Sequence, residues 1–323
     1  MRARTLWSIA QGVMEIREEE VTRPANGVLL KTLYSGVSRG TEATVLAGRV
    51  PPDLAEVMRV PHQGGTFPFP VKYGYCLVGN VSEGPEEMRG KLAFALHPHQ
   101  TRATLDPAAV HLLPDNLPPR RAVLAANTET ALTVAWDASA GPGDRILVVG
   151  AGVVGLLVAR VLRDLPGADV TLLDQNLARS GVAARLGLAL TDVAPSDVDI
   201  AINASGSAAG LQRAIDAAGQ EATVVEASWH GAGTQPLALG GAFHPRRLTL
   251  RSSQVGRIPP GRAPRWTHAR RLATALNVLA EWPEVDALLG PEIPFPDAPR
   301  LLPPLLAPGA DALCPILTYE TGD

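Results

Sequence analysis

The clearest chemical signature in the sequence is a glycine-rich turn at 150–155. Glycines at 150, 152 and 155 give the spacing G-x-G-x-x-G, between an apolar run at 145–149 and another that begins at Val153. In such a turn the first glycine permits a tight bend, the second admits a pyrophosphate, and the third allows close helix–sheet packing. The N–H groups that open the following helix face the phosphates. We therefore expect a dinucleotide to contact Gly150, Gly152, Val153, Val154 and Gly155.

An acidic residue downstream supports this interpretation. Asp174 ends the next apolar strand, nineteen residues after Gly155. This is about the spacing at which a carboxylate reaches the adenosine ribose. A carboxylate accepts hydrogen bonds from ribose hydroxyls and repels a 2′-phosphate, so NAD is the expected cofactor and NADP the less favoured one. Arg179 is expected either to stack on adenine or to be a surface residue, and Ser205 is a further expected cofactor contact.

The elements around these motifs indicate the fold class. From Asp144 onward, apolar strands alternate with helical segments, a pattern typical of a parallel, doubly wound sheet in an α/β protein. The chain up to about Pro118 contains short apolar runs broken by Gly and Pro, which predicts a β-rich or barrel-like domain. A helical stretch is expected from Pro119 to Ala138.

Composition narrows the possible function classes. The chain has 323 residues, enough for about two domains, and no apolar run reaches the ~20 residues that span a bilayer. The net charge of −3 gives no basic footprint for nucleic acid. The two cysteines, Cys76 and Cys314, are too few for a disulfide framework or a four-cysteine zinc lobe. We expect a cytoplasmic protein that binds neither nucleic acid nor membrane.

Several segments resemble the medium-chain dehydrogenase/reductase family, over essentially the whole chain. SGVSRGTE at 35–42 lies where the family has a segment like SGVCHTD, and PVKYGYCLVGNV at 70–81 where it has PVIPGHEGAGIV. The resemblance implies a Rossmann domain at 119–263 and a discontinuous, GroES-like catalytic domain at 1–118 and 264–323, with the active site between them. Segments such as VVEASWHG further resemble the branch that contains bacteriochlorophyllide a 3-hydroxyethyl dehydrogenase.

The resemblance breaks down at the catalytic metal. Zinc-dependent members hold the ion with a cysteine, a histidine and a third cysteine or acid. Here Ser38 takes the first position, Tyr75 the second, and Ala125–Ala126 lie near the third. None of these is a good ligand, so no zinc is expected. His97 and His99 would form a metal pair without a third ligand, and we expect them instead to be exposed or to line a cleft.

Without zinc, side chains must stabilise the charge that develops on the substrate oxygen. Tyr75 is the first candidate, with ordinary packing as the alternative. Thr41 lies, with Glu42, where the zinc enzymes have relay groups, and Glu129 lies near the lost third ligand; capping or solvation competes with catalysis for each. Arg39 aligns with a position that reaches the cofactor pyrophosphate in some members, and a salt bridge to Glu42 is its competing role.

The sequence thus predicts an NAD-dependent oxidoreductase that interconverts a secondary alcohol and a ketone without zinc. An NAD(P)H-dependent quinone or enone reductase and a non-catalytic sensor of the NAD/NADH ratio remain alternatives, and a homodimer remains open. The small-molecule substrate is expected to be bulky and apolar, because Phe67, Phe69, Tyr73 and Trp229 are expected to border the cleft. Packing in the β-domain core is the competing role for the two phenylalanines.

Overall fold

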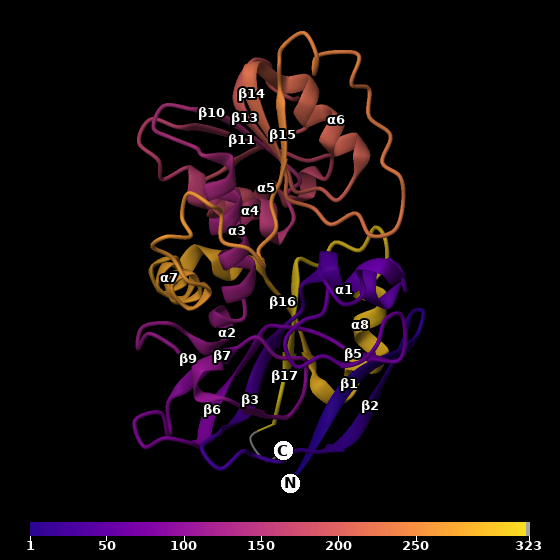
Figure 1. Cartoon of the computed structure of the whole chain (residues 1–323), viewed down its shortest axis with the longest axis vertical. Coiled ribbons are helices and arrows are strands. Elements are labelled where there is room, and N and C mark those ends of the chain that lie inside the picture. The colour runs from indigo at the N-terminus through magenta and orange to yellow at the C-terminus, as the bar shows by residue number, and fades with distance from the viewer. Residues whose placement is uncertain (321–323) are drawn as a thin grey trace. The chain divides into compact units, whose positions relative to one another are not determined.

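The computed structural model describes residues 1–320. The chain divides into two compact units, Met1–Ala126 with Leu276–Asp323, and Asn127–Ala275 (Figure 1). Both boundaries fall later in the chain than the expected ones at 118 and 263.

The later second boundary has a local cause. The Arg271 side chain donates hydrogen bonds to the Glu129 carboxylate and to the carbonyl oxygens of Val255 and Arg257. These bonds tie the loop after the last parallel strand, and the start of the helix that follows it, to the second unit.

The first unit is β-rich. Within the described residues it holds a four-stranded sheet of order β2-β1-β5-β4 and a seven-stranded sheet of order β16-β17-β3-β6-β7-β9, with β8 also paired to β3. The strands are β1 (Arg2–Ala10), β2 (Val13–Glu20), β3 (Val28–Gly36), β4 (Gly64–Gly65), β5 (Val71–Lys72), β6 (Leu77–Glu83), β7 (Leu92–Ala95), β8 (Arg102–Leu105), β9 (His111–Leu112), β16 (Leu289–Pro294) and β17 (Cys314–Thr318).

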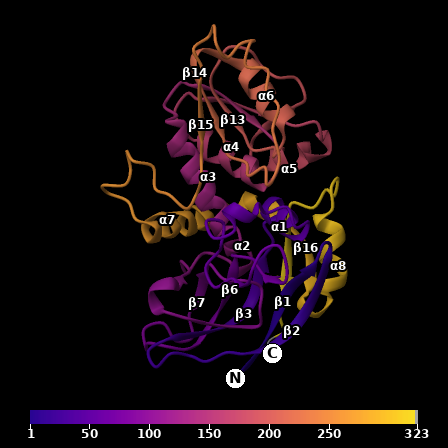
Figure 2. The same cartoon turned by 45° about the vertical axis from the view of Figure 1, so that its right-hand side comes forward.

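Short helices complete the first unit. Helix α8 packs against β2, as Figure 2 shows, and an apolar cluster that includes Leu302, Phe295 and Leu317 lies around it. The helices are α1 (Arg39–Leu46), α2 (Pro119–Ala122) and α8 (Ala298–Leu306), with 3-10 turns η1 (Pro52–Leu54), η2 (Pro107–Ala109), η4 (Pro283–Leu288) and η5 (Phe295–Asp297).

Two helices cross the boundaries between the units, α3 (Ala125–Ala138) and α7 (His268–Glu281). The helical stretch expected over 119–138 is therefore broken into α2 and α3. The break lies at Val123 and Leu124, both fully buried. A side-chain carbon at Gly36 would lie 2.8 Å from the Cβ of Val123, so the backbones pack closely there.

The second unit is built on a parallel sheet of order β12-β11-β10-β13-β14-β15, which confirms the expected doubly wound arrangement. The central strand β10 is almost continuously apolar and buried, as a strand covered on both faces should be. The strands are β10 (Arg145–Val149), β11 (Asp169–Leu173), β12 (Ala189–Thr191), β13 (Val198–Asn203), β14 (Ala218–Glu226) and β15 (Thr249–Ser252).

Helices of the second unit pack on this sheet. Helix α4 contacts β10 and β11, and α6 contacts β10, β13 and β14. The helices are α4 (Val153–Leu162), α5 (Ser180–Arg185) and α6 (Ala208–Ala217), with a 3-10 turn η3 (Leu177–Arg179). In the described part of the chain, no helix combines the length and apolar character that crossing a membrane requires.

Candidate active site

The glycine turn joins β10 to α4 in the second unit. Gly150 has a φ of +105°, which favours glycine, and Gly152 is the N-cap of α4. A Cβ at Gly155 would lie 1.8 Å from the Gly150 carbonyl oxygen, so no larger residue fits without a shift of the turn. A Cβ at Gly152 would meet nothing within 4 Å. The turn therefore leaves open space at the N-terminus of α4, which suits a pyrophosphate.

Asp174 is tied to this turn. Its Oδ2 accepts a hydrogen bond of 2.6 Å from the Ala151 N–H, and its Oδ1 accepts one of 2.8 Å from Asn176. Arg179 donates to the Ala151 carbonyl oxygen, and its Nη1 lies 3.8 Å from Asp174 Oδ2. Each carboxylate oxygen keeps capacity for a further donor, such as a ribose hydroxyl. The residues present therefore fit the adenosine half of a dinucleotide.

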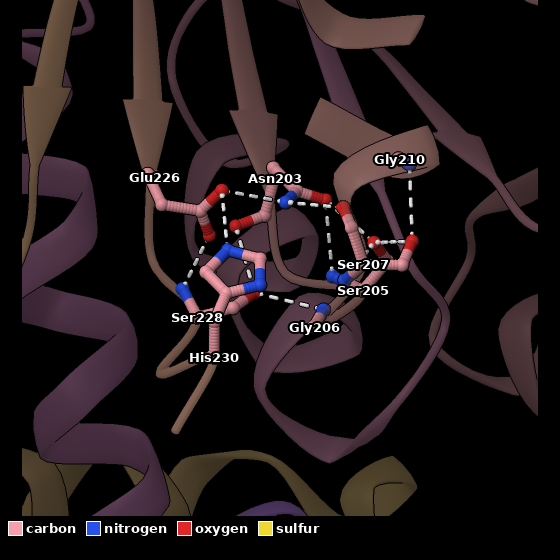
Figure 3. Close-up of polar contacts among 8 residues, drawn as sticks. All are labelled: Asn203, Ser205, Gly206, Ser207, Gly210, Glu226, Ser228 and His230. Atoms are coloured by element: carbon pink, nitrogen blue, oxygen red, sulfur yellow. Dashed lines mark hydrogen bonds and ion pairs between the residues drawn. The ribbon is translucent and has the colours of Figure 1, made fainter. Parts of the chain in front are cut away.

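The carboxyl ends of β13 and β14 carry a second polar group (Figure 3). The fully buried Asn203 donates from Nδ2 to Glu226 Oε2 at 2.7 Å. The Asn203 Oδ1 accepts hydrogen bonds from the N–H and the hydroxyl of Ser205, the expected cofactor contact. Ser207 caps α6 by accepting from the Gly210 N–H. The first turn of α6 is thus fixed to the end of β14.

Glu226 and His230 form the partly buried side of this group, whereas residues 205–207 are exposed. Glu226 Oε1 accepts a 2.7 Å hydrogen bond from the Ser228 N–H, and Ser228 Oγ accepts from the Gly206 N–H (Figure 3). His230 Nε2 lies 3.2 Å from Glu226 Oε2, but neither ring nitrogen makes a hydrogen bond of proper geometry. The sequence analysis missed Glu226. The available signal was an acidic residue at the carboxyl end of an apolar strand.

Three hydroxyl side chains meet in the first unit, and two belong to expected catalytic residues. The Tyr75 hydroxyl shares hydrogen bonds with the side chains of Ser38 and Thr41. Burial raises the pKa of Tyr75 above its usual value, and the two hydrogen bonds only partly oppose that rise. Tyr75 is therefore held in its protonated form, able to donate a hydrogen bond to an oxygen atom.

A second polar network in the same unit is fully buried. His99 Nε2 lies 2.9 Å from Glu42 Oε2, His99 Nδ1 lies 2.7 Å from Ser35 Oγ, and Ser35 Oγ lies 2.8 Å from the Tyr319 hydroxyl. Because an ionised carboxylate only accepts, His99 donates to Glu42, Ser35 donates to His99, and Tyr319 donates to Ser35. Glu42 Oε1 also accepts from the Ser38 N–H at the start of α1.

The two histidines expected to be exposed or to line a cleft are in fact buried. His97 and His99 keep only 4% and 1% of their surface exposed. His97 stacks on His62 with ring centroids 4.9 Å apart, and burial lowers its pKa to about 3. The expectation failed because the strands of the β-rich unit cover this segment. A cavity of about 10 Å³, room for one water, lies between His99 and Tyr73.

Two other expected site residues have structural partners. Glu129 Oε1 accepts from Arg271 Nε at 2.9 Å, and both side chains are buried. Burial raises the pKa of Glu129, although Arg271 opposes that shift. Arg39 donates from Nε to the Leu305 carbonyl oxygen and from Nη2 to that of Ala307, at the end of α8. These contacts compete with the catalytic role expected of Glu129 and the pyrophosphate role expected of Arg39.

The residues at the zinc positions do not fit a zinc ion. Hydroxyls of Ser38 and Tyr75 and methyl groups of Ala125 and Ala126 stand where the metal would need thiolate, imidazole or carboxylate ligands. Within residues 1–320, no group of three or more His, Cys, Asp or Glu side chains is placed to hold a metal ion.

Comparison with known proteins adds to this geometry. No model of a known protein family matches the chain. Among curated proteins, the chain is 34% identical over 116 residues to L-galactonate-5-dehydrogenase of Escherichia coli K12, which covers 36% of this chain and 34% of that enzyme. The match thus spans about a third of the curated relative.

Solved structures match over nearly the whole chain. L-idonate 5-dehydrogenase from Escherichia coli K-12 superposes with a TM-score of 0.80 and 14% identity, covering 99% of both chains. A dehydrogenase from Sinorhizobium meliloti 1021, bound to NADP, superposes with a TM-score of 0.78 and 17% identity, covering 98% of this chain and 99% of that one. At these identities the similarity establishes the fold, and it confirms the expected combination of a Rossmann domain with a GroES-like domain.

Proposed function

We propose that the protein is an NAD-dependent oxidoreductase that interconverts a secondary alcohol and a ketone without a catalytic zinc ion. The observation that carries the proposal is the pairing of an open glycine turn with Asp174 in the second unit. The Tyr75 hydroxyl cluster, at the position of a lost zinc ligand, supports the metal-free chemistry.

NAD is the proposed cofactor. Gly150, Gly152 and the N-terminus of α4 would hold the pyrophosphate, and Asp174 would accept from the adenosine ribose. The Asp174 carboxylate would repel a 2′-phosphate, whereas Arg179 beside it is a cation that attracts one. Because Arg179 also donates to the Ala151 carbonyl oxygen, we assign it to holding the turn.

The chemistry divides between cofactor and chain. When bound, NADH would supply the hydride for the carbonyl carbon in reduction of the ketone. Tyr75 would donate its hydroxyl proton to the carbonyl oxygen, with solvent water restoring that proton, and oxidation of the alcohol would follow the reverse course. Ser38 and Thr41 would hold the Tyr75 hydroxyl in orientation. This arrangement supplies hydrogen bonds where zinc would otherwise supply a Lewis acid.

The proposed substrate is bulky and largely apolar, as in the branch that contains bacteriochlorophyllide a 3-hydroxyethyl dehydrogenase. Phe67 and Phe69 are half-buried rather than enclosed in the core, and the Phe67 ring lies 5.7 Å from that of Tyr73. Flat, partly exposed aromatic side chains suit an aromatic or conjugated ligand.

The test is a substrate screen with the purified full chain. NADH formation is measured with NAD⁺ and 1-phenylethanol, ethanol or L-galactonate, the last chosen from the curated relative. We expect the highest kcat/KM with 1-phenylethanol and larger hydroxyethyl-substituted aromatics. Higher kcat/KM with ethanol or L-galactonate would refute the bulky substrate. NADH oxidation by quinones with no alcohol turnover would favour a quinone reductase.

Metal content is tested separately. Elemental analysis of protein never exposed to a metal-affinity column should find no stoichiometric zinc, and chelator should leave turnover unchanged. About one zinc per chain, retained through chelator treatment, would overturn the metal-free mechanism.

A further inference from the structure

We propose that the Glu226 carboxylate makes the protein bind oxidised NAD⁺ in preference to reduced NADH. The inference rests on the proposed function, because it assigns a charge to the nicotinamide half of the same cofactor site. It is carried by the placement of Glu226 in the sheet and by the neutral character of its hydrogen-bonding partners.

The strand order places Glu226 on the nicotinamide side. A dinucleotide binds across the carboxyl ends of a doubly wound sheet, at the point where strand order reverses, here between β10 and β13. Asp174, after β11, fixes the adenosine half on one side of that point. The other half then extends over the carboxyl ends of β13 and β14, which are Asn203 and Glu226.

The contacts of Glu226 keep its charge uncompensated. In the described part of the chain its carboxylate accepts hydrogen bonds of 2.7 Å from the Asn203 amide and from the Ser228 N–H, both neutral donors. The His230 Nε2 lies 3.2 Å from Glu226 Oε2 but makes no hydrogen bond with the carboxylate. The Glu226 side chain is only 13% exposed, so water screens the charge weakly.

His230 supplies an independent indication of a ligand. Both of its ring nitrogens are buried and have no hydrogen-bond partner, although the side chain as a whole is 15% exposed. Buried polar atoms without partners are rare and destabilising. The nicotinamide half of the cofactor carries an amide and ribose hydroxyls, which are partners of the right kind.

The charge acts differently on the two redox forms. The nicotinamide ring is cationic in NAD⁺ and neutral in NADH, whereas the rest of the cofactor is unchanged. A nearby carboxylate in a weakly screened site therefore attracts the oxidised form selectively. Asn203 and Ser228 are positioning residues that hold the carboxylate at the end of β14 (Figure 3).

The test measures binding and needs no substrate. Calorimetric titration of the full chain at about pH 8 gives Kd for NAD⁺ and for NADH. For Glu226→Gln we expect Kd of NAD⁺ to rise about tenfold relative to that of NADH, for the loss of one weakly screened charge. Equal changes in both constants, or no change, would overturn the inference.

A matched control and a rescue sharpen the result. Asp174→Asn removes the equivalent charge at the adenosine end, so both Kd values should change by the same factor. Glu226→Gln leaves one carbonyl oxygen where the carboxylate offered two, so the side chain cannot accept from both Asn203 Nδ2 and the Ser228 N–H. The double variant Asn203→Asp with Glu226→Gln restores one donor, one acceptor and one negative charge, and should recover the preference for NAD⁺.

The wild-type ratio keeps the inference testable if Glu226→Gln alone fails to fold, because a wild-type protein that binds NADH as tightly as NAD⁺ would overturn it. Where both variants fold, a double variant with the same ratio of Kd values as Glu226→Gln would contradict the charge argument. A wild-type protein that binds neither cofactor would overturn the proposed function and this inference together. Wild-type binding of both, with an unchanged ratio in the variants, would overturn this inference alone.

Discussion

Two histidine–glutamate pairs within residues 1–320 differ in their burial and in their hydrogen bonding. In the first unit, His99 and Glu42 are 1% and 5% exposed, and both ring nitrogens of His99 have partners. In the second unit, His230 and Glu226 are partly exposed, and neither ring nitrogen of His230 has a hydrogen bond. The first pair is buried and fully hydrogen-bonded, whereas the second has unused hydrogen-bonding capacity at the carboxyl end of β14.

The difference separates a polar network that stabilises the fold from a pair that we propose contacts the cofactor. The network of His99 connects β3, α1 and the residue after β17, since Ser35, Glu42 and Tyr319 come from those segments. Removing any member leaves another buried and unpaired. The His230 pair joins the last residue of β14 to the segment that follows it, on a sheet already held by backbone hydrogen bonds between its strands, so less of the fold depends on it.

The largest expected effect is on stability. His99→Ala should lower the free energy of unfolding by about 3 kcal/mol or more, because it leaves Glu42 and Ser35 buried without their partner. His230→Ala, the matched change in the second unit, should cost less than about 1 kcal/mol. Urea unfolding followed by circular dichroism measures both. If His230→Ala lowers the free energy of unfolding more than His99→Ala does, the buried His99 pair is not the more stabilising of the two.

The next effect contrasts two tyrosine hydroxyls of the first unit. Tyr75→Phe should reduce turnover of 1-phenylethanol about a hundredfold with little change in the Kd of NAD⁺, because it removes the proposed donor to the substrate oxygen. Tyr319→Phe removes a hydroxyl from the closed network and should lower stability while turnover stays nearly unchanged. If Tyr75→Phe lowers turnover by less than about threefold, Tyr75 is a packing residue.

Sequence reasoning predicted the structure best where the arrangement of residues depends on local spacing. The glycine turn and Asp174 lie within 25 residues of one another, and strand–turn–helix physics alone determines their arrangement. The doubly wound sheet followed from the same alternation of strands and helices. The Tyr75 and Thr41 side chains were singled out as candidates, and the structure brings them together with Ser38.

The rest depended on contacts that no local pattern reveals. His99 and Glu42 are 57 residues apart, Ser35 and Tyr319 are 284 apart, and Arg271 and Glu129 are 142 apart. The pairing of sheets in the β-rich unit decides which polar side chains become enclosed. For this reason His97 and His99 were expected to be exposed or to line a cleft, and Glu226 was overlooked.

Acid should lower the stability of the first unit, which contains the buried His97, more than that of the second unit. Burial lowers the pKa of His97 to about 3, whereas an unfolded histidine titrates near 6.5. The unfolded state therefore binds more protons as the pH falls, so stability is full above about pH 6.5 and declines below it. The decline should reach about 2 kcal/mol at about pH 5. Urea midpoints across this range measure it, and His97→Gln should flatten the decline; an unchanged slope would contradict the assignment.

The smallest effect concerns the choice between NAD and NADP at Asp174, which follows β11 in the second unit. Asp174 is expected to repel a 2′-phosphate, and Arg179 Nη1 lies 3.8 Å from its carboxylate. Asp174→Ser removes the repulsion and leaves Arg179 available to a phosphate, so the preference for NAD over NADP should narrow about tenfold. Calorimetric titration of both cofactors measures the change. Glu226→Gln is the control, because its charge faces the other half of the cofactor and should not alter discrimination at the 2′ position. A wild-type protein that binds NADP more tightly than NAD would show that Arg179, rather than Asp174, dominates this end of the site.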